Sequence, residues 1–195
     1  MAIWQYRLTA VPEDAVRRRY DHLPTQLFID HEGRRKAWQH RSFTDEDDEP
    51  TFNDAYSTAW WDGLHIPATP VATQLDALLP RTTWGKPSPD YYSWKSDNEN
   101  GPDHDCYLHR NETTDALEWL EFRTDLRPHP QNTGFLAAML TLCREQHLLV
   151  FDDKGWLMKP EVPAVWAAIE QSSAVRFLTK PQEFLDEIRR KLAEE

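Results

Sequence analysis

Long apolar runs and catalytic sequence motifs are both missing from this chain of 195 residues. No stretch approaches the roughly 20 apolar residues of a membrane-spanning helix. G-x-S-x-G, the P-loop, H-E-x-x-H and G-x-G-x-x-G are absent, and only six glycines are available to build a phosphate-binding loop. The N-terminal residues contain neither a basic segment nor an apolar one, so we expect no signal peptide. These absences favour a binding protein over an enzyme, and we expect no cofactor and no membrane association.

Cysteine is scarce as well, since the chain has only Cys106 and Cys143. The two do not form a C-x-x-C pair, and a disulfide framework would need more of them, so we expect reduced thiols and a cytoplasmic protein. The apolar content is 39% and includes nine tryptophans, each of which can bury a large area. This composition predicts one globular domain that spans residues 1–195.

Positive charge is in deficit, and the formal net charge is −11. Such a charge argues against DNA, RNA or an anionic membrane as a ligand, because each would repel the protein. It suits a basic protein partner. The basic triplet Arg17, Arg18 and Arg19 falls where a short helix opened by Pro12 should end, and cations favour that end of a helix. The composition leaves the oligomeric state open.

Periodicity predicts an α+β fold, a two-layer sandwich with a mostly antiparallel sheet and helices packed on one face. A turn is predicted at His31–Gly33, and a loop-rich region is predicted at about 34–68. Besides the helix after Pro12, helices are predicted for 69–79, 132–147, 163–171 and from Pro181 onward. In the helix of 132–147 a buried stripe is predicted at Phe135, Met139, Leu142 and Cys143, which follow the i, i+4, i+7, i+8 pattern. The last helix is predicted to have Phe184, Leu185, Ile188 and Leu192 on its inner side. Strands are predicted for 2–11, 26–30, 91–95, 105–110, 116–126, 147–152 and 156–159.

The strand predicted for 116–126 has two distinct faces, because side chains alternate along a strand. The first face should pack on a helix, and the second should meet water or a partner. The first face has Leu120, Phe122, Thr124 and Leu126, and the second has Trp119, Glu121, Arg123 and Asp125.

An acidic–aromatic segment, residues 45–62, has seven carboxylates and no lysine or arginine. Aromatic anchors surrounded by charge are typical of interface hot spots, where charge speeds encounter and the rings slow release. If Trp60 and Trp61 lie on a strand, at least one of them should be exposed. We therefore predict a binding surface for a basic protein at Asp45, Glu46, Asp47, Asp48, Glu49, Asp54, Tyr56, Trp60, Trp61 and Asp62.

The main alternative is a small hydrolase or transferase that uses Glu121 and Asp125, with His129 nearby. Glu121 and Asp125 share one face of the predicted strand, and two carboxylates that face the same cleft can act as an acid–base pair. However, Arg123 lies between them and should keep both ionised. A surface ladder of ion pairs is the simpler interpretation, so we predict no catalytic residues.

Other ligand classes are less favoured. His104, Cys106 and His109 are close in sequence, but on a strand the third faces away from the first two, so we predict no metal site. Asp45–Glu49 lacks the glycine and the ligand spacing of a calcium loop. Tryptophans can also stack on sugars, but Trp4, Trp119, Trp156 and Trp166 are spaced like core residues.

The second half of the chain resembles a known group of proteins through EWLEFRTDLRP, FLAAMLTLCREQHLLVFDDKG and MKPEVPAVWAAIEQSSAVRFLTKPQEFL. The segments MAIWQYRLTAVP and LDALLPRTTWGKP extend the resemblance to about two thirds of the chain. The group consists of bacterial immunity proteins that are encoded beside polymorphic and contact-dependent toxins. The resemblance implies a cytoplasmic α+β protein that neutralises one cognate toxin by binding it. It assigns no contact residues, so the acidic–aromatic segment is inferred from its own chemistry.

Overall fold

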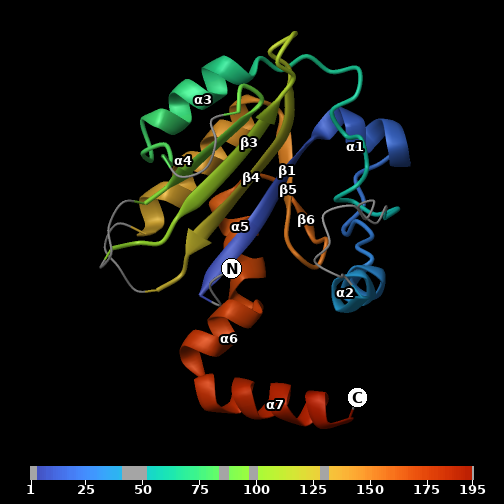
Figure 1. Cartoon of the computed structure of the whole chain (residues 1–195), viewed down its shortest axis with the longest axis vertical. Helices are drawn as coiled ribbons and strands as arrows, with labels where there is room; N and C mark the ends of the chain where they lie inside the picture. The colour runs from blue at the N-terminus through green and yellow to red at the C-terminus, as the bar shows by residue number, and fades with distance from the viewer. Residues whose placement is uncertain (1–3, 41–51, 84–87, 97–100, 128–131, 195) are drawn as a thin grey trace.

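Six strands form one antiparallel sheet in the order β2-β3-β4-β1-β5-β6, as the computed structural model in Figure 1 shows. The structure describes residues 4–40, 52–83, 88–96, 101–127 and 132–194. The strands are β1 (Gln5–Pro12), β2 (Tyr91–Lys95), β3 (Asp105–Arg110), β4 (Leu117–Asp125), β5 (Leu148–Phe151) and β6 (Leu157–Met158). The helices are α1 (Glu13–Tyr20), α2 (His31–His40), α3 (Ala68–Asp76), α4 (Asn132–Glu145), α5 (Val162–Glu170), α6 (Ser173–Thr179) and α7 (Pro181–Glu194). The predicted α+β fold is confirmed.

The N-terminal strand β1 lies inside the sheet, between β4 and β5. Leu8 is opposite Phe122 in one ladder, and Ala10 is opposite Val150 in the other. All four side chains are fully buried. Because β1 has a strand on each side, its backbone groups on both edges can form ladder hydrogen bonds. The first residues of the chain therefore hold together strands that come from its second half.

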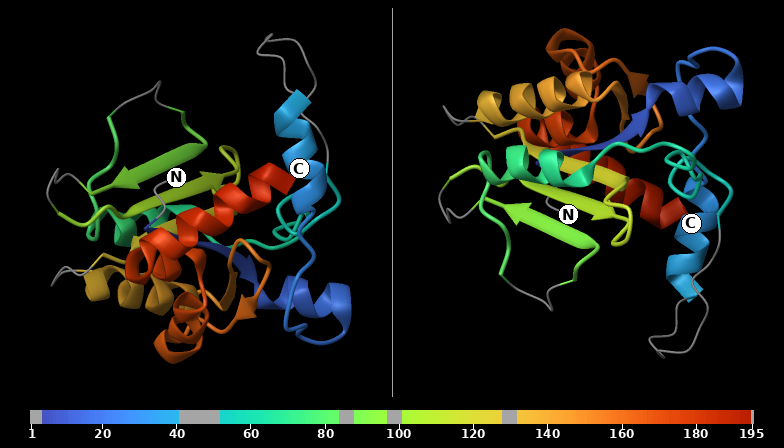
Figure 2. Two further views of the ribbon diagram at one scale, coloured as in Figure 1. Left: turned by 90° about the horizontal axis from the view of Figure 1, so that it is seen from below. Right: turned by 90° about the horizontal axis from the view of Figure 1, so that it is seen from above.

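Helices α3, α4 and α5 lie on one face of the sheet, as the views along it show (Figure 2). On α4 the predicted stripe of Phe135, Met139, Leu142 and Cys143 is buried, in agreement with its helical spacing. On β4 the predicted inner residues Leu120 and Phe122 are buried too. Burying a side chain of this size contributes roughly 1.5–3 kcal/mol, so the packing of α4 on β4 stabilises the fold strongly. The other face of β2, β3 and β4 carries no helix in the described part of the chain, and we call it the open face.

The hairpin from β5 to β6 turns at Gly155, as its glycine predicts. Gly155 has a φ of +83°, a conformation that side chains with a Cβ rarely adopt. Its carbonyl oxygen accepts a hydrogen bond of 2.8 Å from the Leu27 N–H. A Cβ at this position would lie 2.1 Å from the Leu27 carbonyl oxygen. Gly155 therefore holds the segment around Leu27 against the edge of the sheet.

Two predictions near residue 30 are wrong. The strand predicted for 26–30 is an extended segment with one isolated bridge, between Gln26 and Trp156, because β6 is too short to pair with a full strand. The turn predicted at His31–Gly33 is the start of α2. The sequence feature that marks the start of this helix is Asp30. Its carboxylate accepts a hydrogen bond of 2.8 Å from the Gly33 N–H, as at a helix N-cap. Helix α2 also occupies the beginning of the region predicted to be loop-rich.

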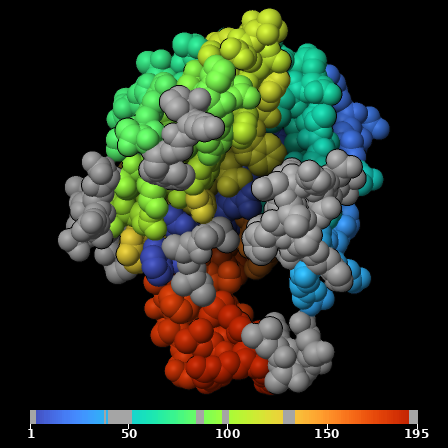
Figure 3. Space-filling model, viewed as in Figure 1, coloured from blue at the N-terminus to red at the C-terminus, as the bar shows by residue number. Residues whose placement is uncertain are grey.

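Helix α6 was not predicted either, although Ser172 caps it by accepting a hydrogen bond of 3.2 Å from the Val175 N–H. It connects the body of the protein to α7, which lies at the foot of the molecule in Figure 3. Within the ranges that the structure describes, every helix is too short or too polar to cross a bilayer.

Candidate functional site

The acidic–aromatic segment is described from residue 52 onward, so the carboxylates Asp45 to Glu49 lie outside the described residues. Asp54, predicted to lie at a surface, is buried. Its carboxylate receives hydrogen bonds of 2.7 and 2.8 Å from the Arg34 guanidinium and others from the backbone N–H groups of Asp30, Tyr56 and Ser57. Burial by itself raises the pKa of Asp54, but these hydrogen bonds outweigh it and lower the pKa to about 2. Asp54 joins two segments of the protein and is not available to a partner.

Trp60 and Trp61 are both buried, with exposed fractions of 3% and 7%, so their predicted role as surface anchors is wrong. They lie in successive turns and not on a strand, and the alternation that would expose one of them does not apply. The Trp60 indole N–H donates a hydrogen bond of 2.7 Å to the Ala55 carbonyl oxygen. Its ring lies 6.4 Å from that of Tyr20, centroid to centroid. Trp60 therefore fixes this segment to α1.

Tyr56 is half-buried between two arginines. The Arg7 and Arg34 guanidinium carbons lie 4.7 and 5.0 Å from the centre of its ring. The ring also contacts Trp119 and Phe151, with centroid distances of 6.4 and 5.3 Å. Burial raises the pKa of Tyr56 to about 12, so it remains a neutral phenol at physiological pH. The contacts thus hold the Tyr56 ring, which comes from a loop, against the open face of the sheet.

Tyr56, Trp61 and Trp119 line a surface pocket of about 300 Å³, together with the carboxylate residues Asp62 and Glu118. We call it the acidic pocket. None of the described residues that line it is lysine or arginine. The Tyr56 ring already has Arg7 and Arg34 beside it, so the Trp119 ring and the carboxylates of Asp62 and Glu118 are the groups that can attract a cation. Through these three residues the pocket is chemically suited to a lysine or arginine side chain.

A row of rings crosses the open face, and the acidic pocket lies at one end of it. We call these rings, which belong to Tyr91, His109, Trp119 and Tyr56, the aromatic row. Tyr91 on β2 is opposite His109 on β3, which is in turn opposite Trp119 on β4. The Tyr91 and His109 rings are 4.7 Å apart. His109 is exposed at one edge, but partial desolvation by its neighbours lowers its pKa, which favours the neutral form. Trp119 then contacts Tyr56. Four elements therefore place their rings side by side on one surface.

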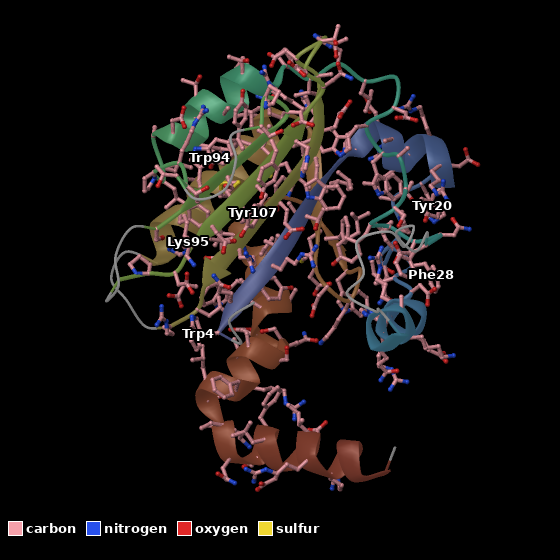
Figure 4. The ribbon with its side chains drawn as sticks, in the orientation of Figure 1. Trp4, Tyr20, Phe28, Trp94, Lys95 and Tyr107 are labelled. Carbon is pink, nitrogen blue, oxygen red and sulfur yellow. The ribbon has the colours of Figure 1, made fainter. Side chains whose placement is uncertain are left out.

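The rest of the open face is occupied by a ladder of ion pairs. Arg7 contacts Glu121 at 2.6 Å, and Arg123 contacts Asp105 at 2.6 Å. Arg123 also donates to the hydroxyl of Tyr107, a residue that Figure 4 labels on this face. These contacts hold charged side chains of three strands in defined positions, which lowers the cost of ordering them when a partner binds.

The residues considered for acid–base catalysis are distributed differently from the prediction. Glu121 and Arg123 share the open face as expected, but Arg123 pairs with Asp105 and not with the carboxylates of its own strand. Asp125 is buried and pairs with Arg127 at 2.6 Å. Burial raises the pKa of Asp125, but its hydrogen bonds with Arg127 and with the backbone outweigh this and lower it. His129 lies outside the described residues. The two carboxylates are therefore held by separate arginines.

His104 and Cys106 are buried, whereas His109 is exposed, which is the separation expected from strand alternation. Across the described ranges, no group of three or more histidine, cysteine or carboxylate side chains is arranged to hold a metal ion. Cys106 and Cys143 are free thiols, and burial raises the pKa of both.

A second surface was missed in the sequence. Phe28 and Trp156 are exposed by 66% and 45%, and they line a wide groove with Met158 and Ala168 at the β6 edge of the sheet. Trp156 and Trp166 were interpreted as core residues from their spacing, but Trp166 is also exposed, by 44%. Trp156 and Trp166 both stand at positions where the apolar pattern of their elements predicts a buried residue. The sequence pattern therefore could not distinguish them from core residues.

Comparison with known proteins finds no family model, no curated protein and no solved structure that matches this chain.

Proposed function

We propose that this chain is a cytoplasmic immunity protein, a binding protein that neutralises one cognate bacterial toxin by direct contact. The observation that carries the proposal is the open face, where the aromatic row ends in the acidic pocket. Rings of tyrosine and tryptophan in fixed positions are typical of interface hot spots. The sequence resemblance supplies the class of partner, a toxin domain.

The acidic pocket supports a basic partner in particular. Asp62 and Glu118 contribute carboxylates, and Trp119 contributes a ring, so a lysine or arginine of the toxin can be held by charge and by cation–π contact together. The overall charge of −11 attracts the same partner over a longer range and raises the rate of encounter. Inhibition of this kind needs only occupancy of the toxin surface, without turnover.

This proposal replaces part of the predicted surface. Tyr56 and Asp62 remain in the proposed interface because they line the acidic pocket. Trp61 also lines the pocket, but it is buried and forms its floor, so it is not proposed as an anchor for the partner. Asp54 and Trp60 are removed from it because they are buried and already bonded. Trp119 and Glu118 are added from β4, on the strength of the same pocket.

The proposal predicts that an adjacent reading frame encodes a large secreted protein with a toxic C-terminal domain, and the test is co-expression of this chain with that domain. We expect this chain to rescue growth and to form a stable complex with that domain. The double variant Asp62→Lys with Glu118→Lys reverses two charges of the acidic pocket. It should weaken the complex about tenfold or more at low salt, because it places like charges at the contact. Both residues are exposed, so folding should be unaffected.

The matched control is Glu161→Lys with Glu170→Lys, two exposed carboxylates at the ends of α5. It changes the net charge by the same amount at a distant surface. A toxin that remains lethal in the presence of the chain rejects the function. An equal loss of affinity in both double variants rejects the acidic pocket as the contact site.

A further inference from the structure

The acidic pocket owes one of its carboxylates to an irregularity in the sheet. His109 on β3 pairs with Trp119 on β4, and the next residue along β3, Arg110, pairs with Leu117. Glu118 is therefore an extra residue on β4, which makes a β-bulge. Strict alternation would place Glu118 on the face opposite Trp119, whereas both residues line the acidic pocket. The bulge thus brings a carboxylate beside Trp119, the residue that pairs with His109.

His109 is the one member of the aromatic row that can carry a positive charge. Its ring lies 4.7 Å from that of Tyr91 on one side, and Trp119 is its cross-strand neighbour on the other. Partial desolvation lowers the pKa of His109 and outweighs the charges of Asp90 and Glu118, which raise it. The imidazole is therefore neutral at pH 7 and becomes charged in mildly acidic solution. One of the two carboxylates that act on it, Glu118, also belongs to the acidic pocket.

The other groups around His109 on the open face are a phenol and charges that already form ion pairs. Tyr107, labelled in Figure 4, precedes His109 by two residues on β3. The ion pairs on these strands and on β1 are Arg7 with Glu121, Arg110 with Asp115 and Arg123 with Asp105. Each of these arginines has a carboxylate of its own, in agreement with Asp90 and Glu118 being the charges that act on His109.

We propose that His109 makes the acidic pocket sensitive to pH: a proton on His109 and a cation in the pocket disfavour each other, so the basic partner is held more tightly at neutral than at mildly acidic pH. This inference rests on the proposed function, since it concerns the same pocket. The two positive charges compete for Glu118 and repel each other across Trp119. A partner that covers the aromatic row also removes water from the imidazole, which disfavours its charged form. Both effects have the same sign.

A model cation tests this coupling without the toxin. The probe is N-acetyl-arginine amide, and the readout is the NMR pH titration of the His109 Cε1 proton in the full chain. With the probe in excess, the titration should move to lower pH, because binding of the cation and of the proton are reciprocally linked. N-acetyl-citrulline amide, which has a similar shape and no charge, should leave the titration in place. The double variant Asp62→Lys with Glu118→Lys should not respond to either compound.

The toxin domain tests the consequence for the complex. The affinity of the wild-type chain should fall about threefold or more between about pH 7.5 and about pH 5.5, where histidines titrate and carboxyl groups ordinarily stay ionised. His109→Gln is neutral at every pH and should lose this part of the pH dependence. His65→Gln is the matched control and should retain it, since His65 is also exposed and follows Leu64 at the edge of the pocket. Comparison of these variants removes the toxin's own titration from the result.

A His109 titration that the arginine probe leaves in place overturns the proposal, as does a probe that does not bind at the pocket. So does a pH dependence that His109→Gln retains or that His65→Gln abolishes. A toxin that stays lethal rejects the proposed function separately, because the probe experiment does not use the toxin.

Discussion

Replacement of Asp54 by asparagine should destabilise the protein strongly and in a way that depends on pH. The Asp54 side chain has an exposed fraction of 0%, and its two oxygens receive the Arg34 guanidinium and three backbone N–H groups. These contacts join α2 and the segment from residue 52 to the chain around Asp30. Asparagine keeps one acceptor oxygen, but it loses the charge and turns an N–H₂ group toward other donors.

The magnitude follows from the pKa of Asp54, which is about 2 in the folded protein against an ordinary value of 3.8. A shift of this size corresponds to about 2 kcal/mol of stability at pH 7. Because the folded pKa is the lower one, this stability is fully present above about pH 5 and is lost as pH falls through 3.8 toward 2. At pH 3 about 1 kcal/mol of it remains. Misplaced donors in the variant add about 1 kcal/mol, which gives a total of about 3 kcal/mol at pH 7.

Urea denaturation from pH 7 down to pH 3 measures this difference in the free energy of unfolding between wild type and Asp54→Asn. Asp62→Asn is the control, because it removes a carboxylate from the same segment at an exposed position. We expect the control to stay within about 0.5 kcal/mol of wild type at every pH. Equal stabilities of the two variants at pH 7 would refute the reasoning. So would a gap between wild type and Asp54→Asn that does not narrow as the pH is lowered.

Two further substitutions test the packing. Trp60→Ala should lower the free energy of unfolding by about 3–5 kcal/mol in urea denaturation because it empties a buried site, whereas a surface anchor would cost less than about 0.5 kcal/mol. Gly155→Ala should cost more than about 2 kcal/mol, measured in the same way, because its Cβ would lie 2.1 Å from the Leu27 carbonyl oxygen at a positive φ. Gly134→Ala is its control, since nothing lies within 4 Å of the added Cβ on α4, and a gain of up to about 1 kcal/mol would be expected there. If the two glycine variants had the same stability, the close approach at Gly155 would be disproved.

Much of the fold could be predicted from local patterns. The strand alternation of β4 identified its buried face, and the spacing on α4 identified its buried stripe, because each signal lies within one element. Helix α2 was missed although Asp30 caps it, since a cap followed by a glycine also resembles a turn. Helix α6 is only seven residues long, too short for a periodic signal.

The candidate site was less predictable, because its members come from distant parts of the chain. Asp54 was interpreted as a surface charge, since its partner Arg34 is 20 residues away and on a helix that was not predicted. The acidic pocket joins Asp62 to Glu118, and the aromatic row crosses three strands and a loop. The spacing of residues within one segment cannot predict that side chains from distant segments lie close together.

The sequence by itself determined the acidic charge, most of the helices and strands, and the two faces of β4. These depend on composition and on periods of two and 3.6 residues, which the chain carries locally. Only the tertiary structure decided that Trp60 and Trp61 are buried while Phe28 and Trp156 face solvent. Whether an aromatic ring meets water depends on which elements the sheet and the loops bring against it, and that is a property of the assembled fold.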